Sequence, residues 1–223
     1  MTVIRTRRKG RITLAAPALR GLTPINAPCP RLRQAGRIVS QPPEAPKKVL
    51  VAYASSEGQT RRIARHVADR LADQGHAVEL LQAEDGTETD LARFDRVIVA
   101  ASIHIGHYQK TLGRFIAEQA GALAGKPSLF LSVSLAAAGH EAEDWRSLAQ
   151  ILADFEKATG WTPGRAEQIA GAYRPSQYDV VTRFVMRRIL ARKDPEADLE
   201  ADKDYTDWPA LDTLVDGWLA GPA

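Results

Sequence analysis

The chain has 223 residues, of which 44% are hydrophobic and 26% are charged, and its formal net charge is +3. This composition is typical of a globular protein. The single cysteine, Cys29, excludes an intrachain disulfide and a metal cluster held by several cysteines. No run of about 18 apolar residues occurs, so the sequence predicts no transmembrane helix.

The first 46 residues differ in composition from the rest of the chain. Residues 1–46 hold seven of the 13 prolines, and nine Arg or Lys against one acid, so they carry a charge of +8 whereas residues 47–223 carry −5. Because they show no sustained apolar period, we interpret them as a disordered, basic, proline-rich extension. Two other interpretations stay open: a targeting peptide, and a basic arm for anionic lipid or nucleic acid.

From Lys47 onward, apolar runs alternate with helical periods. Residues 49–54 form an apolar run that is typical of a buried parallel strand. A helical period follows, with Ile63 and Leu71 on one face, and Gly75 ends it. The alternation continues with strands predicted at 77–81, 94–102, 128–134 and 168–173, and with helices predicted at 110–122, 141–159 and 207–219.

Five short strands that alternate with helices predict an α/β fold, in which a five-stranded parallel sheet has helices on both faces. In such sheets the ligand binds beyond the carboxyl ends of the strands, where the strand order reverses. We therefore expect the functional site in three loops, which we call the first loop (residues 55–60), the second loop (102–109) and the third loop (134–140).

The first loop has the composition of a phosphate-binding loop. It joins a strand to a helix and consists of Ser55, Ser56, Glu57, Gly58, Gln59 and Thr60. Helix N-terminal amides and three hydroxyls can hold an anion there, and Gly58 allows close approach of the backbone. The loop has neither the Gly-Lys-Ser/Thr of a Walker loop nor the dinucleotide pattern Gly-x-Gly-x-x-Gly, which favours a mononucleotide. The alternative is a simple helix N-cap, which needs only one hydroxyl.

The first loop resembles the phosphate loop of flavodoxins, Thr/Ser-x-Thr-Gly-x-Thr, with Ser55, Gly58 and Thr60 at matching places. The third position differs because it holds Glu57, whose carboxylate would repel a phosphate. We therefore expect Glu57 to offer its backbone amide to the phosphate and to turn its side chain away.

A second similarity extends over nearly all of residues 48–208. It rests on the stretches 56–61, 101–108, 169–172 and 205–208, of which the second, with its Ser-Ile-x-x-Gly-His-Tyr pattern, is the most specific. These stretches resemble the bacterial menaquinone-dependent protoporphyrinogen dehydrogenase family. The resemblance implies a long-chain flavodoxin-like fold with an insertion before the last strand, and an FMN enzyme of haem biosynthesis. It also implies that protoporphyrinogen IX is oxidised to protoporphyrin IX and that menaquinone or another quinone accepts the electrons.

The same resemblance implies which residues contact the flavin. In the second loop they are Ser102, Ile103, His104, Ile105, Gly106, His107 and Tyr108. The rings of His104, His107 and Tyr108 can stack on the isoalloxazine or donate hydrogen bonds to it. In the third loop they are Ser134, Leu135, Ala136 and Ala137, which would contact the other flavin edge through backbone groups. We assign no catalytic side chain, and we expect no metal because the two histidines have no third ligand of suitable spacing.

The stretch 174–193 contains six bases and one acid among apolar residues at helical spacing. A basic amphipathic helix suits an anionic membrane surface, where a quinone resides, and Arg183, Arg187 and Arg188 also suit porphyrin propionates. The alternative is a packed helix whose basic face is solvated or shielded by the acidic stretch 194–204. We expect a cytoplasmic protein without a nucleic-acid partner, and we leave open a peripheral contact with the inner face of the membrane and a homo-oligomer.

Three other functions are compatible with the sequence. The main alternative is a flavodoxin-like electron carrier without a small-molecule substrate, although carriers are often strongly acidic and residues 47–223 carry only −5. A regulatory module that has lost the flavin is a second, and a nicotinamide-dependent quinone reductase is a third, for which the chain shows no separate dinucleotide loop.

Overall fold

The computed structural model describes residues 45–85, 89–177, 186–188, 190, 191, 194 and 198–221. Its main sheet has the order β2-β1-β3-β4-β5, and all neighbouring strands are parallel. The strands are β1 (Lys48–Ala54), β2 (Ala77–Gln82), β3 (Arg96–Ser102), β4 (Ser128–Ser134) and β5 (Arg165–Ala170). This is the 2-1-3-4-5 order of flavodoxin-like, doubly wound sheets, so the predicted fold class is confirmed.

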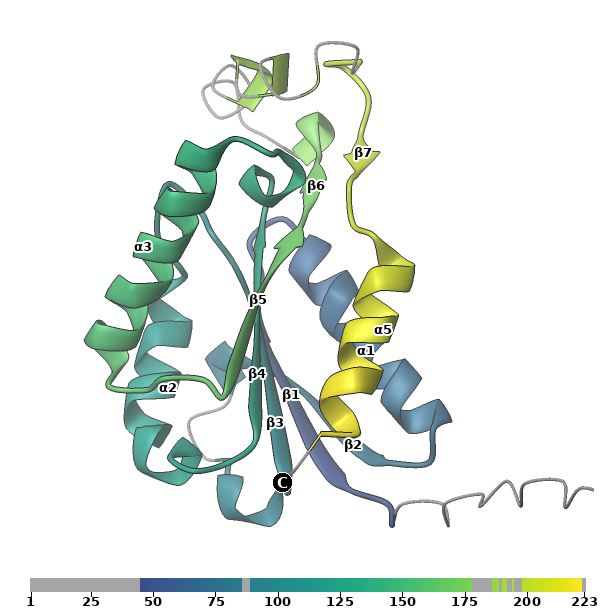
Figure 1. Ribbon diagram of the computed structural model, residues 1–223, viewed down its shortest axis with the longest axis vertical. Coiled ribbons are helices and arrows are strands. Elements are labelled where there is room, and N and C mark those ends of the chain that lie inside the picture. The colour runs from purple at the N-terminus through teal and green to yellow at the C-terminus, as the bar shows by residue number, and fades with distance from the viewer. Residues whose placement is uncertain are drawn as a thin grey trace, which may run out of the picture. The chain divides into compact units, whose positions relative to one another are not determined.

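Helices cover both faces of this sheet (Figure 1). One face carries α1 (Gln59–Asp73) and α5 (Trp208–Leu219), and the other carries α2 (Lys110–Leu123) and α3 (Ala142–Thr159). Short 3-10 turns lie in the connections, namely η1 (Ala83–Asp85), η2 (Leu91–Arg93), η3 (Ala136–Ala138) and η4 (Pro175–Gln177). Within the part of the chain that is described, no helix is both long enough and apolar enough to cross a bilayer.

The central strands are apolar on both faces because helices cover both. In β1, Val49 and Val51 pack towards α1 and α5, whereas Leu50 and Ala52 pack towards α2 and α3. All four side chains are fully buried. Burial of a valine or leucine stabilises a fold by about 1.5–3 kcal/mol, so the central strands form a rigid support for the loops at their carboxyl ends.

The last strand differs from its prediction, which was residues 168–173. β5 spans Arg165–Ala170, and Ala172–Tyr173 form a separate strand, β6, that pairs antiparallel with β7 (Lys203–Asp204). The start of β5 escapes prediction because the first four residues of this edge strand are mostly polar. The chain leaves the sheet at Gly171, where an added Cβ would lie 3.3 Å from a side chain of β4.

A long connection follows β5 and leads to α5. It runs from residue 171 to 207 and contains β6, η4 and β7. The β4–β5 connection, where the resemblance places an insertion, is described in full and consists of η3, α3 and a turn. Arg183 lies outside the described residues, and so do residues 1–44 of the predicted extension.

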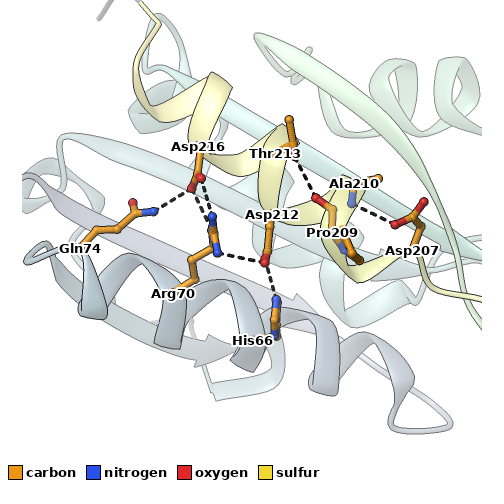
Figure 2. A network of polar contacts seen from close by, with 9 residues as sticks. All are labelled: His66, Arg70, Gln74, Asp207, Pro209, Ala210, Asp212, Thr213 and Asp216. Atoms are coloured by element: carbon orange, nitrogen blue, oxygen red, sulfur yellow. Dashed lines mark hydrogen bonds and ion pairs between the residues drawn. The ribbon is translucent and has the colours of Figure 1, made fainter.

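Charged side chains hold α5 against α1 (Figure 2). Arg70 donates to Asp212 at 2.9 Å and contacts both carboxylate oxygens of Asp216 at 2.9 and 2.5 Å. His66 Nε2 lies 2.7 Å from Asp212, and Gln74 donates to Asp216 at 2.7 Å. The hydrogen bonds from Arg70 lower the pKa of Asp216. The network thereby orients α5, whose amino end adjoins the loops of the sheet's carboxyl edge (Figure 1).

Candidate functional site

The three predicted loops lie at the carboxyl edge of the sheet. β1 and β3 are neighbours, but β1 continues into α1 on one face and β3 into α2 on the other (Figure 1). The strand order therefore reverses between them, which is where doubly wound sheets bind ligands. Ala54 and Ala101 are register partners near the ends of β1 and β3, so the first and second loops begin side by side.

The first loop runs into a helix that has no side-chain cap. Gly58 is the N-cap of α1 with a φ of 82°, and no side-chain hydrogen bond caps the helix there. Ser55 Oγ accepts from the Gly58 amide at 3.0 Å, which fixes the turn. A Cβ added at Gly58 would meet no atom within 4 Å, so the backbone borders open space. An uncapped helix N-terminus beside open space fits an anionic group such as a phosphate.

Gln59 and Thr60 are both buried, and the Gln59 side chain forms its hydrogen bonds within the protein. Its Nε2 donates to Asp204 and Thr206, each at 2.9 Å, and its Oε1 accepts from Arg174 at 2.8 Å. These bonds tie the start of α1 to the segment that follows β5. Gln59 can therefore offer a ligand its backbone amide rather than its side chain.

Side chains also join the first loop to the second. Gln109, which was not among the predicted site residues, donates through Nε2 to Ser56 Oγ at 3.1 Å and to Ser102 Oγ at 2.5 Å. The Glu57 carboxylate lies 3.9 Å from Nδ1 of His104, so it turns towards the second loop. The one sequence signal for Gln109 is its place before a helix, where glutamine is not a favoured cap.

The tip of the second loop is a strained and exposed turn. The backbones of His104 and His107 exchange hydrogen bonds at 2.8 and 3.2 Å. Between them, Ile105 and Gly106 have φ values of 49° and 75°, as in a type I′ turn. Positive φ is unfavourable for a β-branched residue, and Ile105 is 85% exposed. Strain of this kind is concentrated at functional sites.

The ring of Tyr108 lies in the core, which differs from its expected place beside the flavin. It is 8% exposed, and its ring packs edge-on against Phe130 and Phe155 with centroid distances of 5.2 and 4.9 Å. Its hydroxyl donates to Ser132 Oγ at 2.8 Å. Burial raises the pKa of Tyr108 to about 12. The ring fills the space between β4 and α3, so it does not face a ligand at the loops as we expected.

The third loop presents small side chains. Ser134 Oγ accepts from the Ala137 amide at 3.2 Å, within the turn that leads into η3. Trp145, at the start of α3, donates through its indole to the Gly139 carbonyl at 3.0 Å and is 42% exposed. Trp145 and Ile105 are the exposed large apolar residues among those described, and both adjoin the predicted site.

The basic stretch is partly described. Arg187 pairs with Glu200 at 2.6 Å, and Lys203 pairs with Asp194 at 2.5 Å. Arg188 is exposed. The pair between Arg187 and Glu200 agrees with the alternative in which the acidic stretch shields the basic face.

Comparison with known proteins identifies the family. A family model described as a flavodoxin domain matches residues 50–200. Protoporphyrinogen IX dehydrogenase (quinone) of Escherichia coli strain K12 is 32% identical over 161 residues, which cover 72% of this chain and 88% of that protein. The chain belongs to the flavodoxin-domain family that includes this dehydrogenase. This match confirms that the loop motifs are those of the protoporphyrinogen dehydrogenase family.

Two further proteins are similar to this flavodoxin-domain chain. A protoporphyrinogen IX dehydrogenase (quinone) of Leishmania major is 26% identical over 78% of this chain and 76% of that protein. The structure of oxidised flavodoxin 2 from Bacillus cereus is 23% identical, with a TM-score of 0.44, and the match covers 56% of this chain and 84% of that chain.

A flavodoxin domain implies a flavin cofactor, and the residues present fit one. The uncapped start of α1 suits an anionic group, and the Gly58 backbone leaves space there. The third loop contributes the small residues Ala136, Ala137 and Ala138, which are partly exposed.

Proposed function

We propose that this chain binds FMN at the three loops and oxidises protoporphyrinogen IX to protoporphyrin IX, with a quinone as electron acceptor, in haem biosynthesis. The observation that carries this proposal is the match to relatives named protoporphyrinogen IX dehydrogenase (quinone), one of which is covered over 88% of its length. FMN is favoured over a dinucleotide because the first loop has one phosphate-type helix start and no Gly-x-Gly-x-x-Gly pattern.

The residues of the first loop would hold the phosphate of FMN. The amides at the start of α1 would donate to it, and Ser55 keeps Gly58 in the turn that exposes them. Glu57 would face the second loop, near His104, rather than the phosphate. When bound, FMN accepts a hydride and passes electrons on, and the protein supplies binding, orientation and electrostatics.

The second and third loops would receive the ring of FMN and the substrate. Ile105 and Trp145 offer apolar contacts of the kind that suit a flat tetrapyrrole or a quinone. The exposed Arg188 suits a propionate or an anionic membrane surface. We place the reaction in the cytoplasm, at the inner face of the membrane, because a quinone acceptor dissolves in the bilayer.

A reductive half-reaction tests this proposal. FMN-loaded protein is mixed anaerobically with protoporphyrinogen IX in the absence of quinone, and the visible absorbance of the flavin and the fluorescence of porphyrin are followed together. We expect the flavin to bleach as porphyrin appears, and to regain its colour when a menaquinone analogue is added. Flavin-free apoprotein is the control and should form no porphyrin above the buffer rate. Bound flavin that keeps its colour in excess porphyrinogen would contradict the proposal and favour an electron carrier.

A further inference from the structure

Gln109 occupies the junction between the second loop and α2. It is the N-cap residue of this helix, yet its side chain makes no capping hydrogen bond. The side chain instead reaches Ser56 of the first loop and Ser102 at the end of β3, at 3.1 and 2.5 Å. Ser56 lies 53 residues away in sequence, so one amide group joins two loops that are distant in sequence but adjacent in the fold.

The placement of the Gln109 side chain is locally unfavourable in two ways. Among the described residues, Oε1 of Gln109 is buried and has no hydrogen-bond partner. A buried acceptor without a partner is unfavourable, and so is a helix start without a cap. The side chain is therefore placed by its contacts with Ser56 and Ser102 rather than by capping α2.

We propose that Gln109 is a positioning residue for the flavin nucleotide, which holds the first loop at a fixed distance from the second. The inference rests on the proposed FMN site, in which the first loop binds the phosphate and the second binds the ring. A ligand that spans two subsites gains affinity when they are held in register, because binding at one raises the effective concentration at the other. Gln109 should therefore matter for FMN and not for a ligand that occupies one loop.

The test compares Gln109→Met, which keeps the length of the side chain and removes its amide, with Gln150→Met. Gln150 is an exposed glutamine on α3 whose Nε2 donates to Asp154 at 2.9 Å, so it is a matched control away from the loops. Each apoprotein is titrated with FMN and with riboflavin by flavin fluorescence, and with inorganic phosphate by competition. We expect Gln109→Met to raise the Kd of FMN on the order of tenfold, and to leave the Kd values of riboflavin and phosphate within about twofold.

Several outcomes overturn the inference. An unchanged FMN affinity in Gln109→Met would remove the positioning role, while FMN binding by the wild-type chain would leave the proposed function intact. Equal losses for FMN and riboflavin would indicate a direct ring contact or a collapsed loop instead. If Gln109→Met does not fold, as judged by urea denaturation, Gln109→Asn replaces it, since its shorter amide cannot reach both serines and should give the same selective loss. A wild-type chain that binds no FMN refutes the proposed function and this inference together.

Discussion

Replacing Gly58 with alanine tests whether the first loop holds the phosphate. Gly58 has a φ of 82°, a conformation that costs an L-residue about 1–2 kcal/mol more than glycine. The added Cβ would meet no protein atom within 4 Å, so backbone strain is the only cost within the protein. We expect the apoprotein to lose about 1–2 kcal/mol of unfolding free energy for this reason.

Gly75 provides a matched control, because it follows the far end of the same helix. Its φ is 89°, and a Cβ added there also meets nothing within 4 Å. Gly75→Ala and Gly58→Ala should therefore lower stability by similar amounts. Only Gly58 adjoins the helix start at which the phosphate would bind. Loss of one hydrogen bond to a charged group, about 1.5–3 kcal/mol, corresponds to a roughly 10- to 150-fold weaker FMN affinity in Gly58→Ala alone.

Two measurements separate these effects. Urea denaturation of the apoproteins reports stability, and quenching of FMN fluorescence reports affinity. Equal urea midpoints with a selective loss of FMN affinity in Gly58→Ala are the expected result. If both variants bound FMN equally well, the phosphate would have to lie elsewhere, and the assignment of the first loop would be refuted.

Three further substitutions test the structure around the site. Burial raises the pKa of Tyr108 from 10 to about 12, so its neutral phenol contributes stability that is complete below about pH 10 and is lost as the pH rises towards 12. Tyr108→Phe should abolish this alkaline loss, and it should cost about 1–3 kcal/mol at neutral pH because Ser132 loses its hydrogen-bond partner. Urea denaturation at several pH values measures both effects. Ile105→Asn should raise the melting temperature, because Asn-Gly favours a type I′ turn, and it should slow porphyrin formation. A lower melting temperature would contradict the backbone strain at Ile105. The hydrogen bonds from Arg70 lower the pKa of Asp216 below its usual 3.8, so the stability that this ion pair contributes is present above that pH and is lost on acidification. Asp216→Asn should therefore make the free energy of unfolding less dependent on acid pH. An unchanged acid profile would argue against the contribution of this ion pair.

The central strands can be predicted from the sequence because both of their faces are buried, which leaves an unbroken apolar run such as residues 49–54. The edge strand β5 is harder to predict, since Arg165, Glu167 and Gln168 interrupt its apolar pattern. Its true end depends on Gly171, which packs closely against β4.

The positions of the loops also follow from the alternation of strands and helices, but the directions of their side chains do not. His107 and Tyr108 are adjacent in one motif, yet packing against Phe130 and Phe155 takes the tyrosine ring into the core. The role of Gln109 depends on a partner 53 residues away, which no local pattern can indicate. Side-chain placement of this kind is decided by tertiary packing rather than by local sequence.

The most direct test of the proposed activity is turnover with a quinone. FMN-loaded protein, protoporphyrinogen IX and a menaquinone analogue are combined under anaerobic conditions, and porphyrin fluorescence is measured over time. The proposed function predicts fluorescence that grows with protein concentration, requires the quinone and exceeds one turnover of the bound flavin. Fluorescence no greater than in a protein-free control, with flavin shown to be bound, would contradict it.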